Sequence, residues 1–211
     1  MPRLVLISDT HGLGRPFIPD GDILIHAGDL TMMGRTYQIE DVGNWLRSLP
    51  HKHKIVIAGN HDWLFERSRF DAVNALGRGI IYLENSSVTV EGLKFYGSPV
   101  TPWFNDWAFN IRGSTAIRPF WDAIPSDTDV LITHGPPIGV LDQVSSLGNT
   151  EHLGCGELLM AILRIRPKIH VFGHIHGGYG RHETKFGTVC YNASMSDESY
   201  KLVHKPWVVD L

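Results

Sequence analysis

The sequence predicts an α/β protein that contains two sheets. Short apolar runs rich in Val and Ile recur along the chain and end in polar or glycine-rich sequence, which is typical of buried strands. Segments with helical spacing of apolar residues lie between several of these runs, and strands that alternate with helices favour a largely parallel sheet. A hairpin pattern and further strand-like runs follow in the second half of the chain, and these favour a second sheet.

The first part of the chain predicts three strands and one clear helix. The strands are expected at residues 3–8, 22–27 and 54–58. The helix is expected at residues 37–49, because Ile39, Val42, Leu46 and Leu49 fall on one face of a 3.6-residue period. Pro50 follows and predicts where this helix stops.

The second part begins with a hairpin whose strands, residues 88–90 and 93–96, flank Glu91-Gly92. Buried strands are then expected at residues 129–133 and 169–172, and strands nearer the C-terminus at residues 188–192 and 207–209. A helix is expected at residues 157–166, with Leu158, Leu159, Ile162 and Leu163 on one face and Pro167 as its stop.

Length and composition limit the organisation and the partners of the protein. With 211 residues, 43% of them hydrophobic, the chain is expected to form a single domain over residues 1–211. The net charge of −3 and the absence of a basic block argue against strong nucleic acid binding. No apolar run approaches the roughly 20 residues of a membrane span, so we expect neither membrane association nor a signal peptide. Two cysteines are too few for a disulfide framework, and a cytoplasmic location is expected.

Polar clusters follow five of the predicted strands. They are Asp9-Thr10-His11, Gly28-Asp29, Gly59-Asn60-His61-Asp62, Thr133-His134-Gly135 and Gly173-His174-Ile175-His176. In open α/β sheets ligands bind at the carboxyl ends of the strands, so these clusters can converge on one site. Any single cluster can be explained by capping or local hydrogen bonding. All of them together favour a metal site, because carboxylate, amide oxygen and imidazole suit divalent metals and burying so many polar groups is costly without one.

The motif series D-x-H, G-D, G-N-H-D, H and G-H-x-H resembles the calcineurin-like metallophosphoesterases. The flanking sequences at 97–99, 107–110, 133–137 and 173–180 are similar to those of the metallophosphoesterase-domain brain proteins, which are similar in turn to class III cyclic nucleotide phosphodiesterases. The resemblance implies a four-layer αββα sandwich, in which two mixed sheets are flanked by helices.

Carried onto this chain, the resemblance implies a site with two divalent metal ions. Asp9, His11 and His176 hold one ion, Asn60, His134 and His174 hold the other, and Asp29 bridges them. Manganese is the first choice, and iron, zinc, magnesium, cobalt or nickel are alternatives, because mixed nitrogen and oxygen ligands suit several ions. In this family a hydroxide shared by the metals attacks phosphorus in line, while the residue at the position of His61 contacts the phosphate and protonates or stabilises the leaving group.

Two assignments remain open between alternatives. Asp62 either orients His61 or caps the helix that begins near Trp63, and capping is the favoured reading. The aromatic residues of the stretch 99–110 either line the site and stack on a nucleobase or fill space between sheet and loop, and filling is the favoured reading. They are Trp103, Phe104, Trp107 and Phe109. The histidines outside the motifs receive no functional role.

The expected function is a phosphodiesterase that acts on a nucleotide such as a cyclic nucleotide. A phosphomonoesterase acting on a small phosphate ester is a close alternative, and a non-catalytic scaffold that retains the fold is another. A protein phosphatase is disfavoured, because residues 28–34 lack the second Asp and the Arg of the G-D-x-x-D-R-G motif. The expected partner is a small-molecule phosphate ester or nucleotide, and the sequence does not determine the oligomeric state.

Overall fold

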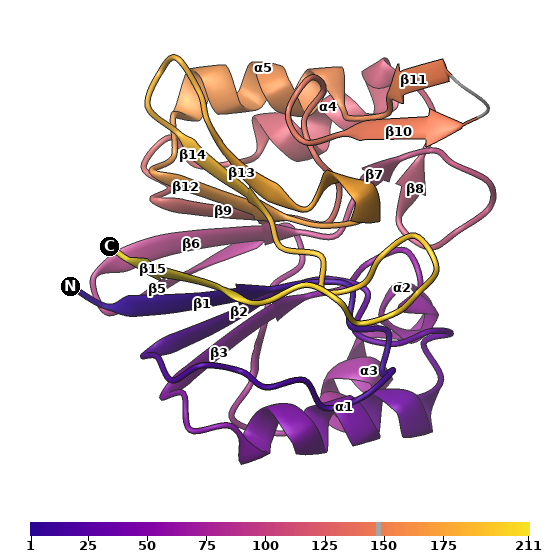
Figure 1. The fold of residues 1–211 in the computed structure, drawn as a ribbon, viewed down its shortest axis with the longest axis vertical. Helices are drawn as coiled ribbons and strands as arrows, with labels where there is room; N and C mark the ends of the chain where they lie inside the picture. The colour runs from indigo at the N-terminus through magenta and orange to yellow at the C-terminus, as the bar shows by residue number, and fades with distance from the viewer. Residues whose placement is uncertain (147–148) are drawn as a thin grey trace.

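Two packed β-sheets and two outer layers of helices form the fold (Figure 1). The computed structural model describes residues 1–146 and 149–211. The first sheet has the strand order β15-β1-β2-β3-β4, and the second has the order β13-β14-β12-β9-β6-β5. The first sheet consists of β1 (Arg3–Ile7), β2 (Ile23–Ala27), β3 (His53–Ile57), β4 (Ile81–Tyr82) and β15 (Trp207–Asp210). The second consists of β5 (Ser86–Val90), β6 (Leu93–Ser98), β9 (Val130–Thr133), β12 (Ile169–Phe172), β13 (Gly180–Glu183) and β14 (Val189–Asn192).

The helices cover the outer faces of the sheets. The first sheet is covered by α1 (Thr36–Ser48), α2 (Trp63–Arg67) and α3 (Arg69–Leu76), and the second by α4 (Ser114–Asp122) and α5 (Gly156–Ile165) (Figure 1). Two short pairs of strands, β7 (Thr101–Pro102) with β8 (Asn110–Ile111) and β10 (Gln143–Ser146) with β11 (Asn149–His152), lie outside the main sheets. The αββα architecture implied by the motifs is therefore confirmed.

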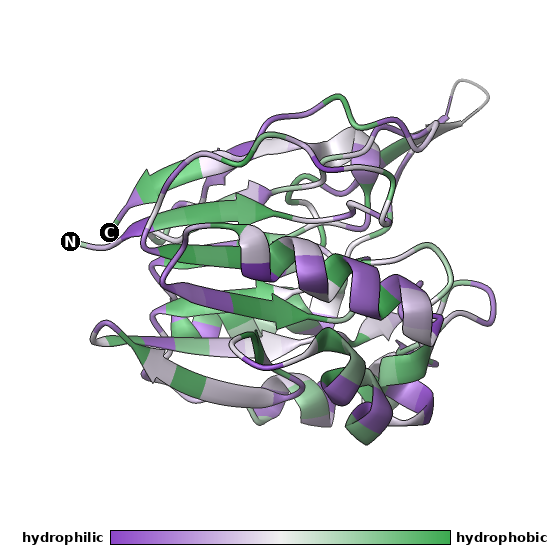
Figure 2. Ribbon diagram, turned by 90° about the horizontal axis from the view of Figure 1, so that it is seen from below, coloured by the Kyte–Doolittle hydropathy of each residue, from purple (hydrophilic) through white to green (hydrophobic). Residues whose placement is uncertain are grey.

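Alternation along β1 explains why its four buried residues, 4–7, are all apolar. Leu4 and Leu6 pack between the two sheets, whereas Val5 and Ile7 pack against the helices on the other face. Successive side chains of a strand point to opposite faces, so a strand covered on both sides must be apolar at every position. In Figure 2 the strands are coloured mainly as hydrophobic, whereas the helices alternate between hydrophilic and hydrophobic residues.

The predicted helices are present, and one of them presents a different face from the one expected. In α1, Ile39, Val42 and Leu46 are buried as predicted. In α5, the buried residues are Leu158, Ala161, Ile162 and Ile165, whereas Leu163 is exposed. The larger apolar side chains suggest a different face, but the small Ala161 lies on the buried face of the helix. None of the helices in the described part of the chain is long and apolar enough to cross a membrane.

The parallel arrangement brings the carboxyl ends of the central strands to one edge. Strands β1, β2 and β3 run parallel in the first sheet, and β9 and β12 run parallel in the second. The two sheets are joined at this edge by a bridge between Ser8 and Ser194, directly after β1 and close behind β14. The loops that leave both sheets therefore meet at one place.

Candidate metal centre

The polar clusters converge at this edge, each on a loop that follows a strand. Asp9 and His11 follow β1, Asp29 follows β2, and Asn60 follows β3. His134 follows β9, and His174 and His176 follow β12. All of these side chains are buried except His174 and His176, which are half-buried.

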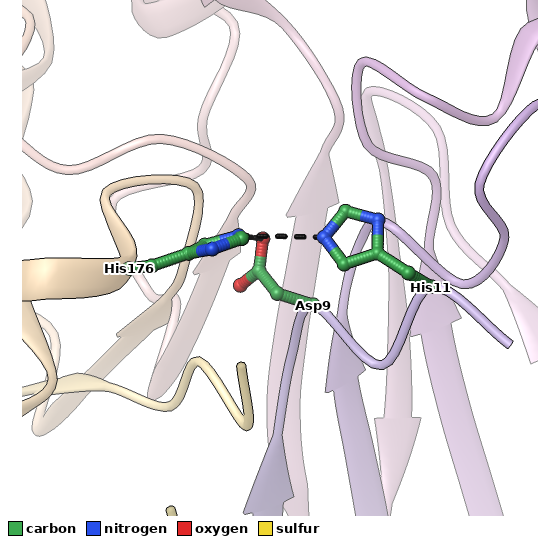
Figure 3. Close-up of side chains that lie close together, drawn as sticks. All are labelled: Asp9, His11 and His176. Carbon is green, nitrogen blue, oxygen red and sulfur yellow. Dashed lines mark hydrogen bonds and ion pairs between the residues drawn. The ribbon is translucent and has the colours of Figure 1, made fainter. Parts of the chain in front are cut away.

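One group of ligand atoms consists of Asp9, His11 and His176. Figure 3 shows the Asp9 carboxylate and the two imidazole rings pointing toward one another. His176 Nε2 lies 3.4 Å from Asp9 Oδ1, and the Nε2 atoms of His11 and His176 lie 3.3 Å apart. The three side chains can hold a single metal ion between them.

A second group lies beside the first, and Asp29 contacts both. Asp29 Oδ2 lies 3.4 Å from His134 Nε2 and 3.9 Å from His11 Nε2. Asn60 Oδ1 lies 2.9 Å from His134 Nε2. The ring of His174 lies with its centroid 5.0 Å from that of His134. Asp29 thus occupies the position between the two groups that a bridging carboxylate requires.

Backbone carbonyls fix the orientation of three imidazole rings. The Nδ1 atoms of His61, His134 and His176 lie 2.8, 3.0 and 2.8 Å from the carbonyl oxygens of Met32, Ala27 and Asp197. A carbonyl only accepts, so each Nδ1 carries the proton and each Nε2 is left facing the cluster. Metal-ligating histidines are typically held in this way. The donor set and its orientation therefore fit divalent metal ions.

Several of these residues have a left-handed backbone. The φ angles are 53° at Asp9, 50° at His11, 53° at Asp29 and 68° at His174. This region is unfavourable for residues other than glycine, and such strain is concentrated at functional sites. The sharp turns direct the side chains into the space beyond the strand ends.

Two glycines make room for the carboxylates. A Cβ atom at Gly59 would collide with the Asp29 carboxylate, and one at Gly173 would collide with the Asp9 carboxylate. No other residue could occupy either position without displacing a candidate ligand.

The close packing of carboxylates and imidazoles shifts their proton affinities. Burial alone raises the pKa of Asp9 and Asp29, but the facing histidines outweigh it and hold both below their ordinary values. Burial alone lowers the pKa of His134 and His176, but Asp29 and Asp9 outweigh it and raise the two pKa values to about 9 and about 8. For His11 and His174 burial dominates and lowers each pKa to about 4.

Among the described residues, the Asp62 carboxylate hydrogen-bonds neither to the first turn of a helix nor to His61, which corrects both readings of this residue. It precedes α2, but its side chain makes no capping hydrogen bond. Its Oδ2 accepts hydrogen bonds from the backbone N–H groups of Leu30 and Gly59, and its Oδ1 accepts from the N–H and hydroxyl of Thr31. Asp62 therefore ties the loop after β2 to the loop after β3, which carry Asp29 and Asn60.

A pocket of about 690 Å³ opens beside the ligands and reaches to the aromatic loop after β6. Trp103, Phe104 and Trp107 line it. Trp103 and Phe104 are 43% and 53% exposed, so the expectation that they fill space between sheet and loop is wrong for these two. Phe109, at 8% exposed, does pack in the core.

Tyr200, which the sequence did not reveal as a site residue, also lines the pocket. Its ring centroid lies 4.9 Å from that of His11 and 5.3 Å from that of His176. It is presented by a turn in which Asp197 Oδ1 accepts hydrogen bonds from Ser199 N and Lys201 N. The carbonyl of Asp197 is also the partner of His176 Nδ1. The segment that contains Asp197 and Tyr200 is polar and has no periodic pattern. Its sequence therefore did not indicate that Tyr200 lines the pocket or that the Asp197 carbonyl orients His176.

Comparisons with known proteins show the family of the chain. The model of a family described as calcineurin-like phosphoesterase matches residues 2–178. Human metallophosphoesterase domain-containing protein 1 is 42% identical over 234 residues, an alignment that covers 99% of this chain and 71% of the human protein.

Solved structures share the fold at low sequence identity. The TT1561 protein of Thermus thermophilus matches with a TM-score of 0.61 at 14% identity, over 99% of this chain and 98% of that one. A putative 5′-nucleotidase from Staphylococcus aureus matches with a TM-score of 0.52 at 12% identity, over 98% of this chain and 53% of that one. At such identities these two likenesses concern the fold alone.

Proposed function

Because the chain belongs to the calcineurin-like phosphoesterase family, we propose that it is a phosphodiesterase that depends on two divalent metal ions and hydrolyses nucleotides such as 2′,3′- or 3′,5′-cyclic monophosphates. The observation that carries the proposal is the position of Asp29. Its carboxylate lies within 4 Å of His11 on one side and of His134 on the other. Two ligand groups that share a carboxylate are the arrangement expected of a two-metal hydrolase.

The two groups divide the ligands evenly. Asp9, His11 and His176 would hold one ion, and Asn60, His134 and His174 the other. When bound, two divalent ions supply Lewis acidity and lower the pKa of a water molecule. Against the charges of Asp9 and Asp29 they leave a formal surplus of about two positive charges, which suits an anionic phosphate ester. Manganese is our first choice for the ions.

His61 is suited to assist the leaving group. Its Nδ1 is held by Met32 O, and its Nε2 lies 4.0 Å from Asp29 Oδ2, at the margin of the ligand cluster. The ring is also one of the residues that line the pocket. A protonated Nε2 in this position can donate a proton to the departing oxygen of the ester.

The aromatic walls of the pocket support a nucleotide substrate. Trp103 is held on one side by Arg112, whose guanidinium carbon lies 3.8 Å from the ring centroid, and its indole N–H donates to Asp106. A ring fixed in this way can stack on a base without losing much freedom. Stacking of this kind contributes about 1–3 kcal/mol per base.

Turnover by manganese-loaded protein tests the proposal. We expect faster hydrolysis of bis-p-nitrophenyl phosphate than of p-nitrophenyl phosphate, followed by activity on members of a cyclic nucleotide panel. The Asp29→Asn variant, treated identically, is the control for contaminating activity. Faster hydrolysis of p-nitrophenyl phosphate would favour a phosphomonoesterase. Inactivity on every substrate would favour a non-catalytic scaffold that retains the fold.

The nucleotide part of the proposal has its own test. Trp103→Ala is expected to raise KM for the best cyclic nucleotide by about tenfold or more through loss of stacking. Phe17→Ala is the matched control, because Phe17 is an exposed aromatic residue (83%) that does not line the pocket. Equal effects of the two substitutions would contradict the stacking role.

A further inference from the structure

Two histidines outside the ligand set occupy comparable places in the two sheets. His26 lies on β2 and His170 lies on β12, and both are fully buried. Each ring contacts the hydroxyl of a threonine on the neighbouring strand or the loop that follows it. His26 Nε2 lies 2.8 Å from Thr10 Oγ1, and His170 Nε2 lies 2.8 Å from Thr133 Oγ1.

Each threonine is adjacent in sequence to candidate ligands of a different metal ion. Thr10 stands between Asp9 and His11, both of which have a left-handed backbone. Thr133 directly precedes His134. The two contacts thus reach the site from different sheets.

The hydrogen bonds around Thr133 define the tautomer of His170. The Thr133 hydroxyl donates to the carbonyl oxygen of Gly135 at 2.7 Å, which closes the turn around His134. Because the Thr133 hydroxyl uses its only proton in this bond, it must accept a hydrogen bond from His170. His170 Nε2 therefore carries a hydrogen. The bond fixes the hydroxyl in the orientation that holds this turn.

These histidines are costly as packing residues. The Nδ1 atoms of His26 and His170 are buried and have no hydrogen-bond partner among the described residues. Burial lowers the pKa of each ring to about 3, so both are neutral at ordinary pH. An apolar side chain would fill either place without leaving a buried nitrogen unpaired, and such exceptions in native structures call for an explanation.

We propose that His26 and His170 are positioning residues, one for each metal ion. His26 acts through Thr10 on the arm that carries Asp9 and His11, and His170 acts through Thr133 on the arm that carries His134. The inference rests on the proposed two-metal site. Partners that orient metal ligands typically change metal affinity by about 10- to 100-fold when they are removed.

Manganese binding to metal-free protein, measured by calorimetry in single-site backgrounds, tests the proposal. In His134→Ala protein, whose intact site is that of Asp9, His26→Phe and Thr10→Val should each weaken binding by about 10- to 100-fold. In the same protein, Thr133→Val should change the manganese affinity by no more than about twofold, far less than the loss expected for a partner of a ligand. In His11→Ala protein, whose intact site is that of His134, the pattern should reverse: His170→Phe and Thr133→Val weaken binding, whereas Thr10→Val does not.

Conservative variants separate positioning from structural damage. Thr10→Ser and Thr133→Ser keep the hydroxyl and should restore most of the affinity that the valine variants lose. Circular dichroism verifies the fold of every variant. The inference would be overturned if Thr10→Val or Thr133→Val weakened manganese binding equally at both sites. It would also be overturned if either variant lowered the melting temperature and left the manganese affinity unchanged.

The wild-type protein distinguishes this inference from the proposed function. Two bound ions in the wild type, together with unchanged site affinities in the valine variants, would overturn the positioning role alone. A wild type that binds no manganese would overturn the metal site and the positioning role together.

Discussion

His61 shows how position defines the role of a single side chain. It contacts the candidate ligand His11, with ring centroids 4.8 Å apart, and Trp107, with centroids 4.4 Å apart. Its backbone N–H donates to Asp29 Oδ1 at 2.8 Å. The residue therefore touches two candidate metal ligands and the pocket wall at once, which suits the proposed action on the leaving oxygen.

The substitution His61→Ala is expected to lower turnover by about two to four orders of magnitude, the usual contribution of general acid catalysis. Metal content, measured by elemental analysis, should remain near that of the wild type, because the other ligands are unchanged. His61 Nε2 also lies close enough to His11 and Asp29 to share an ion with them. Loss of one or both ions from the variant would therefore identify His61 as a ligand and contradict the acid role.

At the scale of elements, the loop after β12 shows how tightly the site is assembled. The backbone N–H of His174 lies 3.1 Å from each Asp9 carboxylate oxygen and donates to that group. The N–H of Gly173 donates to the carbonyl oxygen of His134 at 2.9 Å. The ends of β12, β9 and β1 are thus held together through main-chain groups beside the ligands.

Gly173→Ala is expected to lower both stability and metal affinity. The new methyl group would meet the Asp9 carboxylate and Ser8, and overpacking of this kind typically costs about 1–3 kcal/mol of unfolding free energy. Thermal unfolding with and without manganese measures both effects. Gly156→Ala is the matched control, because no atom lies within 4 Å of its added Cβ and helix α5 begins there. A Gly173→Ala protein indistinguishable from this control would contradict the expectation.

For the whole molecule, the candidate metal site couples the free energy of unfolding to pH. In the metal-free protein the raised pKa values of His134 and His176 stabilise the fold fully below the ordinary value of 6.5. This stabilisation is lost as pH rises through about 8 and about 9, where the folded-state histidines release their protons. Metal ions require the same nitrogens without protons, so their binding strengthens over the same range.

The difference in unfolding free energy between manganese-loaded and chelator-treated protein should therefore widen from pH 6.5 to pH 9. An ion at one hundred times its Kd adds about 2.7 kcal/mol at each site. Denaturant titrations at constant free manganese measure the difference. A gap that stays constant or narrows as pH rises would contradict protonation of these histidines in the metal-free fold.

The predictable part of the fold consists of its buried strands, and the missed part consists of elements whose local signals conflict. Helix α4 contains Pro119, which argues against a helix interior, yet Ile117 and Trp121 bury one side of it against the second sheet. Strand β13 reads Gly-Arg-His-Glu and has no apolar residue, because it is an edge strand that pairs only with β14. In both cases tertiary contacts outweighed local propensity.

The sequence by itself determined which residues end the central strands and that their side chains suit divalent metals, because both depend on local order along the chain. Only the tertiary structure decided that Asp62 ties two ligand loops together, that Tyr200 faces His11, and that His26 and His170 contact the threonines beside the ligands. Periodicity reports how deeply a segment is buried. It does not report which distant segment packs against it, and that choice depends on how the two sheets meet.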